Sequence, residues 1–161
     1  MYLLGFILDF RNEIMFEITT KIIINATPSE VWKVVSEIDN DSQFWKGTTK
    51  IRNTSKNGNM FNREIILKNS DKCYKKIILF PMDGIHIRWT EGTINGIKDI
   101  LITPVGQQTL LHVEMSYKIK GIADLFPRHV SEGLLDEAEL ALQLIKEQVE
   151  KKNLLQLNQK Q

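Results

Sequence analysis

Turn signals recur at short intervals through the middle of this chain, between Gly47 and Ile119. They are Lys56-Asn57-Gly58-Asn59, Asn69-Ser70-Asp71, Met82-Asp83-Gly84, Asn95-Gly96 and Val105-Gly106-Gln107. The breaks come about every 10 to 13 residues, which fits an antiparallel strand meander and is too short for the helical crossovers of βαβ units. Asn57-Gly58 and Asn95-Gly96 are the strongest hairpin signals, because the central residues of a primed turn need positive φ.

The segment before this region adds a strand and a short helix. Residues 16–25, FEITTKIIIN, are rich in β-branched residues and partly alternate, as a strand does. Residues 27–30, TPSE, then supply an N-cap, a proline at the first helical position and the glutamate of a capping box. Apolar residues at helical spacing predict a helix that ends near Ile38, and a second brief helical turn is expected from Asp41 to Trp45. With the meander, this predicts roughly seven strands.

The period of the apolar residues changes again in the last third of the chain. From Ala123 to about Leu155 they repeat at three and four residues, which predicts one long amphipathic helix. The stripe consists of Val130, Leu134, Ala138, Ala141, Ile145 and Val149. Because a bent sheet of so few strands cannot close on itself, the helix must lie across its concave face and complete the core. We therefore expect an α+β fold in which a curved antiparallel sheet wraps around a long C-terminal helix.

The length and composition favour one globular domain. The chain has 161 residues, of which 42% are hydrophobic and 25% charged. We assign residues 16–155 to the domain and residues 156–161 to a frayed tail. Met15 directly precedes the first strand, so residues 1–15 are interpreted as an N-terminal extension or as the product of a misplaced start. Alternatively, they form a short helix packed on the domain.

Charge and cysteine content narrow the set of partners. Lys plus Arg number 21 and Asp plus Glu number 20, so the basic excess that nucleic-acid binding needs is missing. The apolar run at the N-terminus is too short to span a bilayer, and we expect no stable membrane insertion. The single cysteine, Cys73, suits a reducing compartment and predicts a cytoplasmic protein. The expected oligomeric state is a monomer or a weak homodimer.

No cofactor or metal is predicted. The three histidines, at positions 86, 112 and 129, have no ligand-like spacing. Phosphate-binding loops, nucleophile elbows and dinucleotide fingerprints are absent from the sequence. Cys73 lacks a local base that would make it a nucleophile and is interpreted as a strand side chain. No compact catalytic constellation is visible, so the catalytic residues, if any, stay unassigned.

The element order and one local segment resemble a known superfamily. The segment is IIINATPSEVWKVVS, residues 22–36, followed by Ile38-Asp39 and Phe44-Trp45. It is similar to the start of the helix-grip fold in the START-like, or SRPBCC, proteins, which include polyketide cyclases and lipid carriers. The resemblance extends from residue 16 to about residue 152. It implies an internal cavity that binds a hydrophobic small molecule such as a lipid, quinone or polyketide; a cyclase/dehydrase-type enzyme and a protein-interaction module are the alternatives.

Strand alternation selects the side chains that face the helix. Trp89 and Glu91 share a face, as do Met115 and Tyr117, whereas His86 and His112 point to solvent. The residues predicted to contact a ligand are Trp45, Phe61, Arg63, Ile65, Ile87, Trp89, Glu91, Met115, Tyr117, Leu134, Ala138, Ala141 and Ile145.

Several of these positions have two interpretations. Glu91 is either a cavity acid or base, or a strand-end residue that meets solvent. Arg63 can anchor a ligand carboxylate or phosphate if it faces inward, but a register slip would exchange it with Glu64. The small residues Ala138 and Ala141 allow either close packing or empty space.

The mouth of the predicted cavity is also open to two interpretations. Phe44-Trp45 and residues 121–127 are expected to flank it. Glycine and proline in the second segment permit a hinged loop, so the aromatic residues act either as a lid or as ordinary core at the helix ends.

Overall fold

The computed structural model describes residues 3–8, 14–68, 70–119 and 127–160. These residues form eight strands, two α-helices and one 3-10 helix. In chain order the elements are β1 (Leu3–Leu8), β2 (Ile14–Ile24), α1 (Pro28–Val35), η1 (Ile38–Gln43), β3 (Thr48–Asn57), β4 (Met60–Leu67), β5 (Lys72–Phe80), β6 (Gly84–Glu91), β7 (Ile94–Val105), β8 (Gln108–Ile119) and α2 (Pro127–Asn158).

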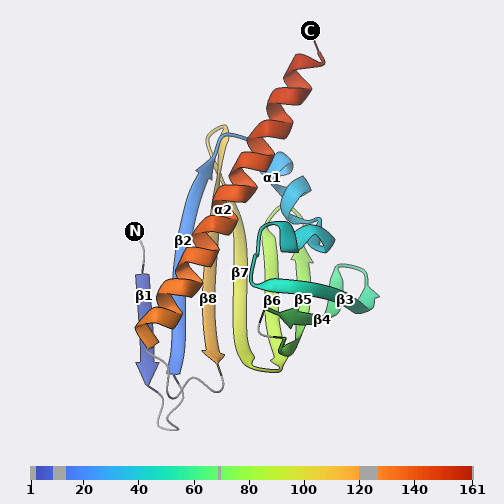
Figure 1. Cartoon of the computed structure of the whole chain (residues 1–161). Helices are drawn as coiled ribbons and strands as arrows, with labels where there is room; N and C mark the ends of the chain where they lie inside the picture. The colour runs from blue at the N-terminus through green and yellow to red at the C-terminus, as the bar shows by residue number, and fades with distance from the viewer. Residues whose placement is uncertain (1–2, 9–13, 69, 120–126, 161) are drawn as a thin grey trace.

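All of the described strands belong to one antiparallel sheet, in the order β1-β2-β8-β7-β6-β5-β4-β3. The seven predicted strands are β2 to β8, and β1 adds an eighth at the edge, where Leu3 pairs with Thr19. The interpretation of this N-terminal segment as a short helix is therefore wrong for residues 3–8. Figure 1 shows α2 lying diagonally across one face of the sheet, as the helix-grip arrangement requires.

The start of α1 follows the predicted capping box. The side chain of Thr27 accepts a hydrogen bond from the backbone N–H of Glu30 at 3.4 Å, and the Glu30 carboxylate accepts one from the Thr27 N–H at 2.7 Å. These bonds satisfy two of the backbone donors that a helix N-terminus leaves free. The next element, η1, is a 3-10 helix that begins at Ile38, earlier than the brief helical turn expected from Asp41. Phe44 and Trp45 follow it and are buried.

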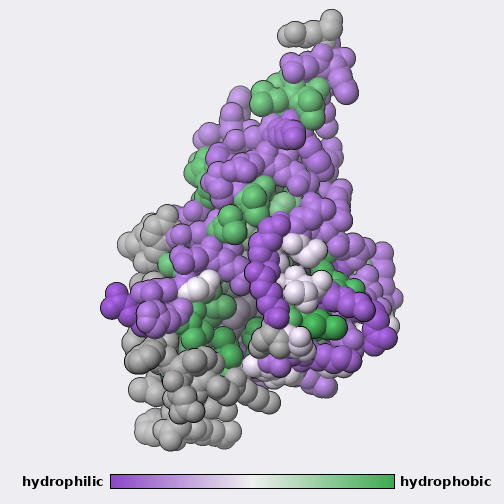
Figure 2. Space-filling model, viewed as in Figure 1, coloured by the Kyte–Doolittle hydropathy of each residue, from purple (hydrophilic) through white to green (hydrophobic). Residues whose placement is uncertain are grey.

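Helix α2 buries the last four residues of the predicted stripe against the sheet, and leaves Val130 and Leu134 half-buried. Ala138, Ala141, Ile145 and Val149 are at most 2% exposed, and Leu142 joins them. The helix is described from Pro127, so its predicted start at residues 123–126 lies outside the described residues. It continues to Asn158, and Figure 1 shows this end projecting past the sheet. Exposed leucines on that projecting end give the hydrophobic patch near its tip in Figure 2. Among the described helices, none is both long and apolar enough to cross a bilayer.

The two strongest hairpin signals have different outcomes. The predicted hairpin between β3 and β4 forms, but its turn residues are Gly58-Asn59, one position later than predicted: Gly58 has φ 58°, whereas Asn57 is the last residue of β3 and pairs with Met60. The hairpin predicted at Asn95-Gly96 is wrong, because both residues lie inside β7 and the β6–β7 turn falls earlier, at Gly92. A Cβ on Gly96 would lie 2.0 Å from the Ser116 carbonyl oxygen. This glycine therefore permits close approach of β8 rather than a chain reversal.

Candidate functional site

A small cavity lies between the inner face of the sheet and the first half of α2. Its volume is about 70 Å³, enough for a few water molecules and below the roughly 300–1,000 Å³ of typical ligand pockets. Its walls combine aromatic and aliphatic side chains with two lysines and one glutamate. The lining residues are Trp45, Gly47, Thr48, Leu67, Lys75, Trp89, Ile94, Lys98, Met115, Tyr117, Leu134 and Glu137.

Most of the predicted ligand-contacting residues fall into two groups. Those that line the cavity are Trp45, Trp89, Met115, Tyr117 and Leu134. Those that are packed in the hydrophobic core without reaching it are Ile65, Ile87, Ala138, Ala141 and Ile145, and Phe61 lies half-buried under the Lys56 ammonium. The two alanines therefore serve close packing of helix on sheet, and the empty space lies about one helical turn earlier, beside Leu134.

Glu91 is exposed at the end of β6 and does not line the cavity, so it meets solvent as the second interpretation expected, and the inward face assigned to it together with Trp89 is wrong. The reason is a bulge in β6: Lys75 pairs with Trp89, but the preceding residue, Tyr74, pairs with Glu91, which leaves Thr90 as an extra residue. An extra residue reverses the alternation of side chains beyond it. Glu91 consequently joins Tyr74 on the outer face, while Trp89 stays inside.

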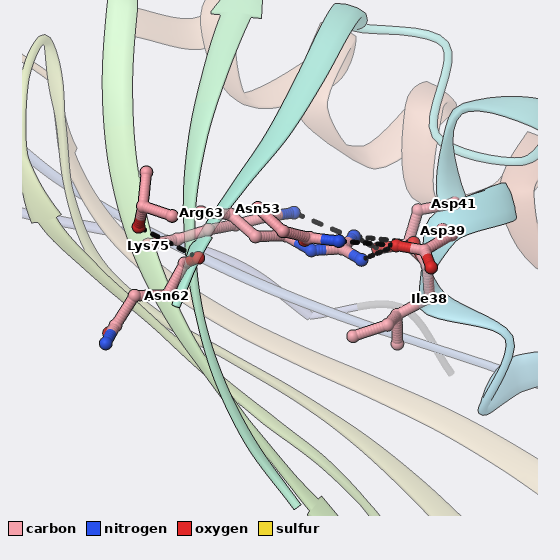
Figure 3. A network of polar contacts seen from close by, with 8 residues as sticks. Ile38, Asp39, Asp41, Asn53, Asn62, Arg63 and Lys75 are labelled. Atoms are coloured by element: carbon pink, nitrogen blue, oxygen red, sulfur yellow. Dashed lines mark hydrogen bonds and ion pairs between the residues drawn. The ribbon is translucent and has the colours of Figure 1, made fainter. Parts of the chain in front are cut away.

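Arg63 points inward as predicted, but its guanidinium is held by η1 rather than by the cavity. Its Nη1 donates to the Ile38 carbonyl oxygen at 2.6 Å, and its Nη2 donates to the Asp39 carboxylate. Asp41 lies 3.9 Å from Nη1. Figure 3 shows the Arg63 side chain running from β4 toward these acidic residues. Burial lowers the pKa of Arg63, and the two carboxylates oppose that shift.

Two lysines that the sequence analysis did not single out face the interior. Lys75 on β5 and Lys98 on β7 are only 6% and 5% exposed. The pleat of each strand places them there: Lys75 shares the face of buried Cys73 and Ile77, and Lys98 the face of buried Ile100. Alternation along β5 and β7 is the signal that predicts both positions.

The two lysines have different surroundings. Lys75 Nζ lies 3.9 Å from the Asp41 carboxylate and 5.5 Å from the centre of the Trp89 ring. Lys98 Nζ lies 3.3 Å from the centre of the Trp45 ring and forms no ion pair within the described part of the chain. Burial lowers the pKa of Lys75, and burial together with the Lys75 charge lowers the pKa of Lys98 to about 7.

Neutral donors complete the polar side of the cavity. Trp89 and Tyr117 meet edge to face, with ring centres 5.9 Å apart, and the Trp89 indole N–H has no hydrogen-bond partner among the described residues. Burial raises the pKa of Tyr117, so its phenol stays protonated at neutral pH. Glu137, the only acidic residue in the described lining, accepts a hydrogen bond from the Gly47 N–H at 3.0 Å. Donors therefore outnumber acceptors around this space.

The histidines do not contribute to the cavity. His86 and His112 are half-buried on the outer face of the sheet, where His86 Nδ1 lies 2.6 Å from Asp99 Oδ1 and His112 Nε2 lies 3.6 Å from Glu114. Within the described residues, no group of three or more potential metal ligands comes together.

Solved structures share this fold at low sequence identity. A protein from Thermus thermophilus superposes with a TM-score of 0.73 at 13% identity, covering 84% of this chain and 98% of its own. The Zhui aromatase/cyclase from Streptomyces sp. R1128 gives 0.67 at 14%, covering 86% and 95%. A START superfamily protein from Mycobacterium smegmatis gives 0.67 at 13%, covering 84% and 97%. The fold is thus the START-like helix-grip fold.

Residues 15–150 match the family described as polyketide cyclase / dehydrase and lipid transport, and the chain belongs to that family. No curated protein sequence matches the chain.

Proposed function

We propose that this protein binds a hydrophobic small molecule, of lipid, quinone or polyketide type, in the cavity between the sheet and α2. The observation that carries the proposal is the space lined by Trp45, Trp89, Met115 and Leu134 beside the buried core. Concave, mostly apolar spaces with a few convergent polar groups are the usual form of small-molecule sites.

The size of the cavity sets a condition on this binding. At about 70 Å³ it holds a head group but not a whole lipid, so the walls must separate when the ligand enters. Met115 and Leu134 are the wall residues suited to this, because methionine has a flexible unbranched side chain and Leu134 lies on the half-buried edge of α2. Binding is therefore expected to move α2 relative to the sheet.

Native mass spectrometry of the freshly purified protein, together with titration by the neutral fluorescent probe N-phenyl-1-naphthylamine, tests the proposal. We expect a retained apolar molecule or saturable binding of the probe. Leu134→Trp fills the cavity and should weaken probe binding at least about tenfold, or about 1.4 kcal/mol. Leu140→Trp, on the exposed face of the same helix, is the matched control and should leave binding unchanged. Absence of both a retained molecule and probe binding would contradict the proposal.

A second candidate function uses the same cavity for cyclase/dehydrase-type proton transfer. Lys98 favours it, because a group whose pKa is about 7 can both accept and donate a proton near neutral pH. The test is turnover of a poly-β-ketone substrate, with loss of turnover in Lys98→Met as the expected result. If the wild-type protein binds the substrate without turnover, the enzyme candidate is rejected and ligand binding is the function that remains.

A further inference from the structure

In the described part of the chain, the inner face of the sheet carries three buried cations, and the acidic residues near them are unevenly distributed. Arg63 forms an ion pair with Asp39. Asp41 lies 3.9 Å from Arg63 and also 3.9 Å from Lys75, so these two cations share it. The side chain of Asp39 is 76% exposed, so its charge is largely screened by water. The remaining buried cation is Lys98.

Glu137, the acidic residue of the described cavity wall, offsets the Lys98 charge only in part: it and Asp41 raise the pKa of Lys98, but burial and the Lys75 charge lower it more. Glu137 is engaged by the Gly47 N–H and forms no ion pair with Lys98 in the described residues. Lys98 instead faces the Trp45 ring and lines the empty space. A buried ammonium without a paired anion is costly, and an anion placed in the cavity would relieve that cost.

This inference rests on the proposed function: we infer that the hydrophobic ligand is an acid whose carboxylate docks in the cavity between Lys98 and Lys75. A carboxylate is smaller than a phosphate or sulfonate head group, which suits a space of about 70 Å³. The indole N–H of Trp89 and the phenol of Tyr117 are the further donors available to its oxygens. The apolar part of the ligand lies along the aliphatic wall formed by Leu67, Ile94, Met115 and Leu134.

Such binding depends on pH in a defined direction. The charged groups that act on Lys98 are Lys75 from β5, which lowers its pKa, and Asp41 from η1 and Glu137 from α2, which raise it. Tyr117 from β8 lines the same cavity, and Arg63 from β4 acts on Lys75 and pairs with Asp39 of η1. Only the protonated Lys98 attracts a carboxylate. Its protonated fraction falls from about 0.9 at pH 6 to about 0.1 at pH 8, so affinity for a carboxylate should fall about tenfold over that interval.

The experiment compares octanoate with octanamide, which has the same chain and a neutral head, by calorimetry at pH 6 and pH 8. Octanoate should bind the wild-type protein at least about tenfold more tightly at pH 6, and this preference should shrink about tenfold at pH 8. Lys98→Met should lose the preference while it still binds octanamide. Lys21→Met, which removes an exposed lysine on β2, should behave as wild type.

The outcomes separate the two proposals. Equal binding of octanoate and octanamide, or an octanoate preference that persists in Lys98→Met, would overturn the acid inference and leave the proposed function standing. Failure of octanoate, octanamide and N-phenyl-1-naphthylamine alike to bind the wild-type protein would overturn both. Loss of the preference in Lys98→Met alone, with octanamide affinity retained, supports the inference and excludes a folding defect as its cause.

Discussion

Arg63 on β4 and Lys98 on β7 are buried cations on the same face of the same sheet, yet their surroundings differ. Arg63 is 1% exposed and bonded to a backbone carbonyl and a carboxylate of η1. Lys98 is 5% exposed, rests on the Trp45 ring and has no ion-pair partner within the described residues. The two side chains are thus similarly buried, but among the described residues Arg63 has ion-pair partners and Lys98 has none.

The difference separates two uses of a buried charge. Arg63 donates to the Ile38 carbonyl and the Asp39 carboxylate, and these bonds connect η1 to the sheet (Figure 3). Around Lys98 the described residues supply no paired acceptor, and a cavity lies beside the ammonium instead. The first arrangement stabilises the fold, whereas the second lowers stability in a form that a bound anion can reverse.

The largest effect is expected from Arg63→Met. It leaves the Ile38 carbonyl without its buried donor and Asp39 without its cation, and it leaves Asp41 paired with Lys75 alone, so it should destabilise the protein by about 3–5 kcal/mol in urea unfolding. Arg63→Lys keeps the charge but not the forked donor geometry and should restore only part of this loss. If Arg63→Met lowers the free energy of unfolding by less than about 1 kcal/mol, the claim that the contacts of Arg63 with η1 stabilise the fold is contradicted.

Lys98→Met is expected to act in the opposite direction. It removes an uncompensated buried ammonium and keeps the volume of the side chain, so at pH 7 it should stabilise the ligand-free protein by about 1–4 kcal/mol in the same assay. The exposed-lysine control Lys21→Met should stay within about 0.5 kcal/mol of wild type. Destabilisation of Lys98→Met would mean that Lys98 has a structural role like that of Arg63.

The stability of the wild-type protein should rise with pH above neutrality. The pKa of Lys98 is about 7 in the folded protein and near its ordinary value of 10.5 when unfolded, so between these values the unfolded state binds more protons. From pH 7 to pH 9 this contributes about 2 kcal/mol of added stability. Lys75, whose pKa is also lowered, contributes in the same direction. The urea midpoint should rise less between pH 7 and pH 9 in Lys98→Met than in the wild-type protein. Equal rises in the two proteins would refute the assignment of this pH dependence to Lys98.

The smallest effect is expected from Trp45→Leu. The Trp45 ring stabilises the charged form of Lys98 by cation–π attraction worth about 0.5–2 kcal/mol. Its removal should lower the pKa of Lys98 still further, measured by the titration of the lysine 13Cε signal. Trp32→Leu, a half-buried tryptophan of α1, is the control and should leave that titration unchanged.

Sequence pattern predicted the framework because each framework signal is local. The capping box at Thr27, the β3–β4 hairpin and the α2 stripe depend on residues close together in the chain; the capping box and the helix are confirmed, and the hairpin forms with its turn one residue later than predicted. Asn95-Gly96 carries an equally strong turn signal, but its glycine is required by the neighbouring strand β8. A single sequence does not show which of these two uses a glycine serves.

The candidate site was predicted less well because it depends on register and on charge. The bulge at Thr90 turns Glu91 outward, and no reliable sequence pattern predicts a bulge. Lys75 and Lys98 occupy inward positions that strict alternation indicates, yet their residue type favours an exposed position. The compensation of Arg63 by η1 joins segments that are distant in sequence, and only the folded chain reveals it.

The most direct test of the central claim is the pKa of Lys98, followed by 13Cε NMR with and without saturating octanoate and assigned by the signal that Lys98→Met removes. We predict a pKa of about 7 in the free protein and a value raised above about 8 in the complex, because the carboxylate supplies the missing counter-charge. A pKa near the ordinary lysine value in the free protein, or one that octanoate does not raise, would contradict the account.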